Sequence, residues 1–131
     1  MRGHSHIPKN KFDFAAVDQL CLLPFEVVKK DVLLLMEWLQ DGNWPVAEGI
    51  AKYLKPHVNE ISPELIAVFK GDDSMWKYWI LHGLILQFPG KLDQNLIAAI
   101  RNIAEHPSNI EIEDGVDKAA KDVIDNKILC G

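Results

Sequence analysis

The 131-residue chain carries 14 lysine and arginine residues against 19 aspartate and glutamate residues, a formal net charge of -5, and 48% of its residues are hydrophobic. This length and composition indicate one folded domain over residues 1–131 and argue against a disordered chain. Because only Arg2 and Arg101 are arginines, the charge argues against a nucleic-acid partner and favours a basic one.

The cysteines and the N-terminal stretch bear on location. Cys21 and Cys130 have no zinc-like spacing, so we expect two free thiols in a reducing cytoplasm. Residues 1–11, MRGHSHIPKNK, lack the apolar core of a signal peptide, and we expect a flexible tail there. The apolar run at 79–88 is about half the length needed to cross a bilayer. The sequence therefore predicts a cytoplasmic protein without a membrane partner.

Apolar residues recur at helical spacing along nearly the whole chain, which predicts an all-α fold. A short first helix over about 14–22 has Asp13 as its N-cap and ends before Pro24. A second helix over about 25–40 carries one continuous apolar stripe and stops at the Asp-Gly pair that follows it.

The next two predicted helices both contain a proline in the first turn. Asn43 is the expected N-cap of the third helix, which ends at Lys55. Ser62 is the expected N-cap of the fourth helix, which ends at Gly71. Each begins where a missing backbone N–H costs nothing, because the first turn of a helix has no internal acceptor for it.

The C-terminal part is predicted to hold three more helices. A fifth helix over about 74–88 is apolar on nearly all sides, so we expect it in the middle of the structure. Asp93 caps a sixth helix that ends at His106, a polar loop covers 108–115, and a charged seventh helix begins at Val116.

Two stretches of the chain nearly repeat each other. Residues 41–54 match residues 73–86 after a shift of 32 positions, which superimposes Trp44 on Trp76. A period of this size, built from paired helices, is typical of a solenoid in which each pair buries its apolar face against the next. We therefore predict an introductory helix followed by three stacked helical hairpins, about seven helices in total.

Three segments also carry a family resemblance: IPKNKFDF at 7–14, LLMEWLQDGNWPVA at 34–47 and GDDSMWKYWIL at 71–81. The chain resembles a small bacterial family of uncharacterised proteins that share a domain of unknown function. The resemblance implies a HEAT-like or armadillo-like fold, a right-handed α-α superhelix of helical hairpins. It implies no catalytic residues and no established activity.

The tryptophans are the first candidates for a recognition surface. Trp38, Trp44, Trp76 and Trp79 either line a concave binding face or fill the core between hairpins. For Trp76 and Trp79 we favour the core, because the helix that carries them is apolar almost all round. For Trp44, at an inter-helix corner, partial exposure and burial both stay open.

The turns between helices supply a second set of candidates. Asp41, Asp72 and Asp73 could hold a cation or a basic side chain, but turn aspartates more often cap the next helix, and we favour capping. The sequence after Asp41 does not continue into an EF-hand pattern, so no metal site and no cofactor are expected. The candidate binding residues are Asp41, Asn43, Trp44, Asp72, Asp73 and Lys77.

The histidines give no clear metal site. His4 and His6 form an HxH pair in the expected tail, and two imidazoles without a third ligand bind metal poorly. His82 stands between Leu81 and Gly83 in an apolar run, so we expect a buried or half-buried histidine.

Motifs for catalysis, such as GxSxG, HExxH, GxxxxGK[ST] and GxGxxG, do not occur. We therefore expect a non-enzymatic module that binds another protein in the groove of its helical stack. The alternative is a nucleic-acid-acting or other enzyme on a HEAT-like scaffold, with an aromatic and acidic cleft; its lysines are too dispersed to favour it. The sequence leaves the oligomeric state open.

Overall fold

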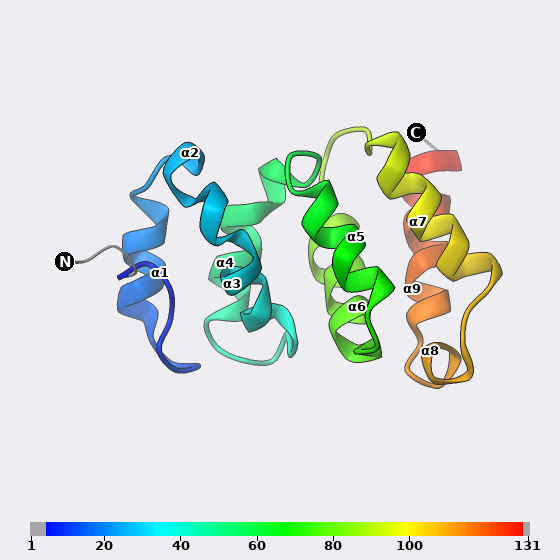
Figure 1. Ribbon diagram of the computed structural model, residues 1–131, viewed down its shortest axis with the longest axis horizontal. Coiled ribbons are helices and arrows are strands. Elements are labelled where there is room, and N and C mark those ends of the chain that lie inside the picture. The colour runs from blue at the N-terminus through cyan, green and yellow to red at the C-terminus, as the bar shows by residue number, and fades with distance from the viewer. Residues whose placement is uncertain (1–4, 130–131) are drawn as a thin grey trace.

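A computed structural model of the chain describes residues 5–129, with side chains through residue 127. All regular structure in this range is helical, and it contains no strand, as the apolar spacing predicts. The helices follow one another along the long axis, from α1 at one end to α7, α8 and α9 at the other (Figure 1). No helix in the described part of the chain is both long and apolar enough to cross a membrane.

The N-terminal third contains α1 (Phe14–Cys21), α2 (Phe25–Val28) and α3 (Val32–Met36). The carboxylate of Asp13 accepts a hydrogen bond from the Ala16 N–H, so the predicted cap of α1 is confirmed. The single helix predicted over 25–40 is wrong, because 3-10 turns at Lys29–Asp31 and Glu37–Leu39 interrupt it. The first break falls at Asp31, whose backbone leaves the α-helical region with φ -104° and ψ 8°.

Asp31, where the helix is interrupted, is in contact with the N-terminal segment. His6 Nε2 lies 2.9 Å from Asp31 Oδ2, and the two residues are only 3% and 4% exposed. The Val46 N–H also donates to the Lys11 carbonyl. Within the stretch expected to be a flexible tail, His6 and the Lys11 carbonyl thus bond to the rest of the fold. His4 lies outside the described residues.

The next helices are α4 (Ala47–Leu54), α5 (Ser62–Lys70) and α6 (Ser74–Ile80). The prediction that Asn43 caps the third helix is wrong, because α4 begins four residues later without a side-chain cap. Asp41 accepts a hydrogen bond from the Asn43 N–H at 2.8 Å and closes a local turn instead. Asp73 does cap α6, through a 3.0 Å bond from the Trp76 N–H.

The helix that begins as α6 does not end as a plain α-helix. After α6 the chain continues in a π-helical turn over Leu81–Ile85, marked by the Leu86 N–H donating to the Leu81 carbonyl at 2.9 Å. Ser62 stands inside α5 as its first residue, and its hydroxyl donates to Asp93 instead of capping its own helix. The N-cap of α5 is therefore Ile61, one residue before the predicted Ser62.

The C-terminal third contains α7 (Gln94–Glu105), α8 (Asn109–Glu113) and α9 (Val116–Val123), with a π-helical continuation at Ile124–Leu129. Asp93 caps α7 as predicted. The polar loop predicted over 108–115 is wrong, since it contains α8. A reciprocal pair of bonds between Ser108 and Glu111 starts this short helix, and Gly115 ends it with φ 77°.

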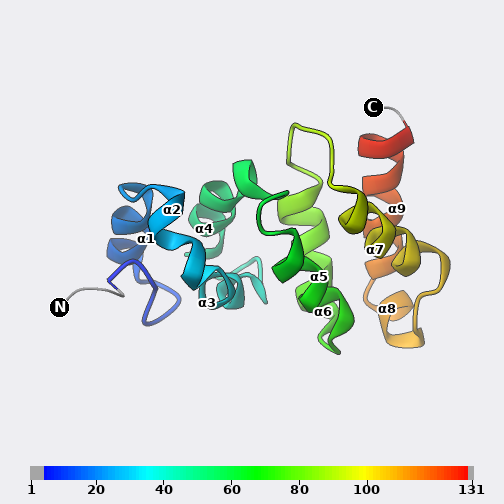
Figure 2. The ribbon, with the colours of Figure 1, turned by 45° about the horizontal axis from the view of Figure 1, so that its top comes forward.

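The helices form two layers. In Figure 1, α3, α5 and α7 lie nearer the viewer and α4, α6 and α9 lie behind them, and Figure 2 keeps the same grouping after a 45° turn. Neighbours pack within each layer, α5 against α7 and α6 against α9. The pair α5 and α6 lies in the middle of the row, so the apolar fifth helix is central, as its composition predicts.

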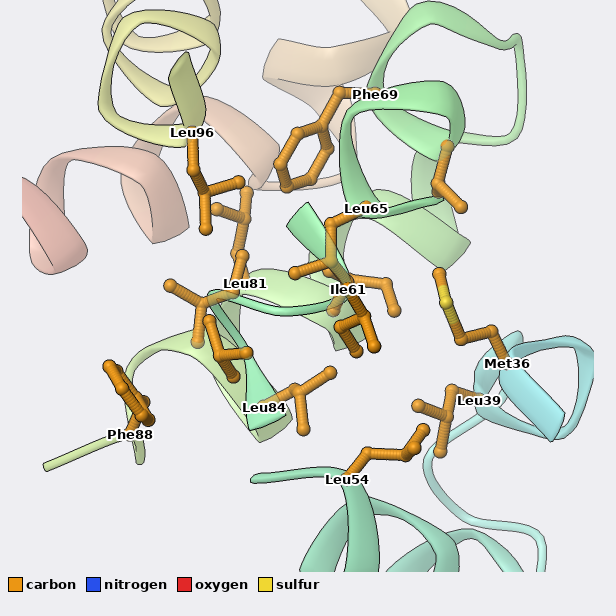
Figure 3. Close-up of a cluster of buried hydrophobic side chains, with 14 of the residues drawn as sticks. Met36, Leu39, Leu54, Ile61, Leu65, Phe69, Leu81, Leu84, Phe88 and Leu96 are labelled. Atoms are coloured by element: carbon orange, nitrogen blue, oxygen red, sulfur yellow. The ribbon is translucent and has the colours of Figure 1, made fainter. Parts of the chain in front are cut away.

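The core runs between the two layers. Figure 3 shows Ile61, Leu65, Leu81 and Leu84 at the centre, with Leu96 on the side of α7. The facing side is supplied by the N-terminal third and α4, through Met36, Leu39 and Leu54. Most of these side chains are fully buried, so the central pair is held by apolar contact on both sides.

One polar joint connects successive hairpins outside the core. The side-chain amide of Asn59, in the turn before α5, donates to the Lys91 carbonyl at 2.8 Å and accepts from the Asp93 N–H at 2.7 Å. Asp93 in turn accepts from the Ser62 hydroxyl. The connection between α6 and α7 is therefore fastened directly to the start of α5.

Candidate binding groove

A groove of about 470 Å³ opens between α4 and the helix formed by α6 and its π-helical turn. Its apolar lining comes from Leu39, Ala47, Ala51 and Leu84, on three different elements. Most of the lining thus comes from α4 and from α6 with its π-helical turn, which lie in the same layer of the fold (Figure 1). Its size is within the range of ordinary ligand sites.

Trp79 forms a fixed aromatic wall of this groove. A Cβ atom added to Gly42 would lie 2.3 Å from Cε3 of Trp79, so the indole rests directly on the Gly42 backbone. The ring also meets the Tyr78 ring edge-on, with centroids 5.2 Å apart. The close contact at Gly42 restricts the indole, because any residue larger than glycine at position 42 would push it away.

Gly83 leaves an open space in the groove. A Cβ atom added to this residue would meet no other atom within 4 Å. Gly83 belongs to the π-helical turn, and the wider turn offsets the angular drift of an α-helix, so that Trp79, Gly83 and Gln87 all line the groove. Such turns are frequent at functional sites. The missing side chain at Gly83 therefore creates part of the groove's depth.

Charged side chains form a row along the opposite wall. Glu48, Lys52 and Lys55 follow one another at helical spacing on α4 and the 3-10 turn after it, and all three line the groove. None of the three takes part in an ion pair within the described residues, 5–127. The groove thus has two positive charges and one negative charge in a chain whose net charge is -5.

The predicted site residues are only partly brought together. Asp41 and Asn43 flank Gly42 at one end of the groove, but neither lines it. Trp44 is half-buried and packs edge-on against Trp38 at 5.5 Å, outside the groove. These three predicted residues therefore lie near the groove in sequence, but none of them lines it.

The other predicted site residues lie at the start of α6. Asp72 and Asp73 are exposed, and Asp73 is used as the helix cap. Trp76 is half-buried and donates its indole N–H to the Met36 carbonyl at 2.9 Å, while Trp79 is also half-buried. Trp76 packs against the core without being enclosed by it, so the core interpretation holds for one side of its ring, whereas Trp79 is not part of that cluster and lines the groove.

Lys77 is buried and does not belong to a surface site. It is 6% exposed, and its Nζ lies 2.7 Å from Oε2 of Glu111, which is 8% exposed. Burial acts to raise the pKa of Glu111, but hydrogen bonds from the Lys77 ammonium and the Ser108 N–H outweigh it and hold that pKa below its ordinary value. The pair fastens α6 to α8 and is structural.

His82 was expected to be buried or half-buried, and this is wrong. Its side chain is exposed and stacks on the Tyr78 ring with centroids 5.4 Å apart. The π-helical turn places it on the outer side of the helix while Leu81 and Leu84 point inward. Over the described part of the chain, no group of three or more His, Cys, Asp and Glu residues is placed to hold a metal ion.

The groove residues that sequence analysis missed had weak but visible signals. Gly83 interrupts an apolar helix without ending it, which often marks a packing or functional position. Lys52 and Lys55 recur with Glu48 on one helical face, a spacing that was interpreted as a dispersed, solvated charge pattern. Their shared role depends on the neighbouring helix, which only the fold supplies.

Comparison with known proteins identifies a family. A family profile described as "Domain of unknown function (DUF5071)" matches residues 6–124, a range that contains the whole groove. A search of the curated proteins finds no match to this chain. The resemblance stated from the sequence is confirmed as far as a family of domains of unknown function.

Proposed function

Since the chain belongs to the DUF5071 family of domains of unknown function, we infer its function from its own surface and propose a protein-interaction module. In this proposal the groove between α4 and α6 binds a short segment of a partner protein. The observation that carries it is the indole of Trp79, which rests on Gly42 in a groove where Gly83 leaves an open space. A pre-positioned aromatic side chain that lines a pocket is the kind of residue that dominates recognition energetics.

The composition of the groove supports a protein ligand. An apolar lining with one tryptophan is bordered by charged and amide groups from Glu48, Lys52, Lys55 and Gln87. Protein interfaces combine an apolar, aromatic centre with a polar rim in the same way. We propose no catalytic step, because a carboxylate, two ammonium groups and an amide on an open wall suit recognition.

The proposal includes an arrangement of the helices as stacked, HEAT-like hairpins in a right-handed superhelix. Three observations support it: the shift of 32 positions between residues 41–54 and 73–86, the two layers of helices, and the joint from Asn59 to the next connection. The groove then lies between the second helices of two consecutive hairpins. Stacked-repeat proteins use this continuous surface for binding.

An enzyme acting on nucleic acid is the second possibility. Trp79 beside Lys52 and Lys55 could stack on a base near two phosphates. Glu48 in the same row and the net charge of -5 oppose a phosphate backbone. We therefore prefer the protein ligand and use a single-stranded oligonucleotide as a comparison in the test.

The test is to close the groove from within. Short peptides selected from a random displayed library against the whole protein should bind the wild type and Gly83→Ala, and lose about tenfold or more in affinity for Gly83→Leu. The leucine side chain enters the open space, so the fold is expected to keep its thermal midpoint. Gly83→Ala is the matched control, because a methyl group leaves most of the groove free.

Two results would contradict the proposal. Selected peptides that bind wild type and Gly83→Leu equally do not use the groove. An oligonucleotide that binds with the same dependence on Gly83, in the absence of any groove-dependent peptide, would favour the nucleic-acid function instead. Denaturation scans of both variants show whether a lost interaction comes from the groove or from unfolding.

A further inference from the structure

The charges that face the groove are distributed unevenly. On the α4 wall, Glu48 lies at one end, Lys52 follows one turn later, and Lys55 lies at the other end. The elements that face this row contribute only uncharged groups, Trp79 and Gln87 from the α6 side and Gly42 from the turn before α4. No carboxylate from the opposite wall therefore neutralises the two ammonium groups.

The lysines also lie close to apolar surface. Lys55 is half-buried, Lys52 is exposed, and both border the lining that contains Ala51 and Leu84. Lysines at the C-terminal end of a helix are favourable for the helix dipole, which alone would explain their presence on α4. It does not explain why both turn toward an unfilled groove, where an incoming carboxylate would find two ammonium groups beside an aromatic wall.

Resting on the function proposed above, we infer that the occupant is an acidic amphipathic segment of the partner protein. A large apolar side chain of this segment packs on Trp79 above Gly83, and an aspartate or glutamate one turn away pairs with Lys52 and Lys55. This reverses the basic partner expected from the net charge. The charge of -5 belongs to the whole surface, whereas recognition depends on the charges inside the groove.

Glu48 gives the bound segment a direction. It precedes Lys55 by seven residues, about 10 Å along the axis of α4. A segment that places its acidic side chain at the lysine end should therefore tolerate or prefer a basic side chain at the Glu48 end. The same peptide with its charges exchanged meets like charges at both ends.

The experiment uses the peptides selected on the wild-type protein. We expect them to combine a large apolar residue with an aspartate or glutamate and to lose about tenfold in affinity when Lys52→Glu and Lys55→Glu are combined, because two ion pairs are lost and like charges then repel. Selection on this double variant should enrich lysine and arginine instead. Lys29→Glu with Lys30→Glu, two exposed lysines outside the groove, is the control and should change nothing.

A milder pair of substitutions separates lost attraction from added repulsion. Lys52→Gln with Lys55→Gln removes the charges without reversing them and should weaken the same peptides by a smaller factor, about threefold. Raising the salt concentration should weaken wild-type binding and leave the glutamine variant unaffected, because screening acts on the ion pairs. Equal salt dependence of the two proteins would overturn the inference.

Different experimental results would contradict the interaction groove and the acidic segment. Peptides that require an open Gly83 but carry no acidic residue, or that ignore the lysine substitutions, would overturn the acidic segment and leave the interaction groove standing. Peptides that ignore Gly83→Leu would overturn the groove, and the acidic segment with it. Thermal midpoints of the lysine variants, expected to match the wild type at these exposed or half-buried positions, exclude unfolding as the cause.

Discussion

The buried pair of Lys77 and Glu111 gives the sharpest prediction for stability. Replacing the lysine by methionine keeps an unbranched side chain of similar length but removes the ammonium group 2.7 Å from Glu111 Oε2. The carboxylate would then stay buried between α6 and α8 without its counter-charge. Breaking a buried ion pair from one side costs about 3–5 kcal/mol.

The expected loss lies at the low end of that range, about 3 kcal/mol, because the second carboxylate oxygen keeps its bond from the Ser108 N–H. Adding Glu111→Gln should recover about 1–2 kcal/mol, since the amide retains the bond to Ser108 and carries no buried charge. The double variant is therefore expected to be more stable than Lys77→Met alone.

The same pair predicts a pH dependence. Because the pKa of Glu111 is lower in the folded protein than in the unfolded chain, the unfolded chain binds more protons in the window between the two values. The stabilisation is fully present above the ordinary carboxyl pKa and is lost as the pH falls through the folded value. Lys77→Met should therefore lose less additional stability on acidification than the wild type.

Urea denaturation followed by circular dichroism, at neutral and acidic pH, measures all of these quantities. Lys118→Met, on the exposed face of α9, is the control and should change the free energy of unfolding by no more than about 0.5 kcal/mol. A cost below about 1 kcal/mol for Lys77→Met would refute the reasoning, because it would mean that Glu111 reaches solvent or another partner once the lysine is gone.

Three further substitutions test local features by denaturation midpoint. Gly42→Ala should cost about 1–3 kcal/mol and shift tryptophan emission, because the new Cβ displaces the indole of Trp79. Gly115→Ala should cost about 1 kcal/mol, because φ 77° is unfavourable for any residue with a Cβ. Ser108→Ala should cost about 1 kcal/mol and speed hydrogen exchange at the Glu111 N–H, which loses its capping acceptor.

Each of these has a matched comparison. Gly83→Ala, where the added Cβ meets nothing within 4 Å, should stabilise the helix by up to about 1 kcal/mol, the opposite sign to Gly42→Ala. Gly115→Asn should cost less than Gly115→Ala, since asparagine tolerates the left-handed region. Asn109→Ala, beside the cap in an exposed position, should leave exchange at Glu111 unchanged. Equal effects within any pair would contradict the stated cause.

The helices were predictable wherever a local rule decides them. Apolar spacing indicates nearly every element, and Asp13, Asp73 and Asp93 mark three of the starts, because a capping carboxylate bonds to an N–H only two or three residues away. The capping box of Ser108 and Glu111 would also have identified α8. It was missed because a five-residue helix carries too short an apolar pattern to stand out.

The break in the second predicted helix could not be predicted in this way. It coincides with the contact between Asp31 and His6, which is 25 positions earlier in a segment that looks like a tail. The groove also depends on residues far apart in the sequence, since Trp79 rests on the backbone of Gly42 and Gly83 leaves the groove an open space. Long-range pairs of this kind leave no periodic pattern in the sequence.

Lys77 and Trp79 show why the sequence pattern could not predict which side chains of this helix are buried and which line the groove. They are two positions apart on a helix that is apolar nearly all round, so the pattern gives no facing direction. By residue type the lysine was expected at a binding surface and the tryptophan in the core. In the fold, the lysine is enclosed against α8 and the tryptophan lines the groove.

The two hydrogen bonds between the Asn59 side chain and the connection from α6 to α7 have a mechanical consequence. Under tension applied at the two ends of the chain, the bonds to the Lys91 carbonyl and from the Asp93 N–H share the load, because both come from one side-chain amide. They must rupture together before that connection can peel away from the start of α5. In an optical trap, this joint should yield in a single step, and Asn59→Ala should lower the force at which it yields.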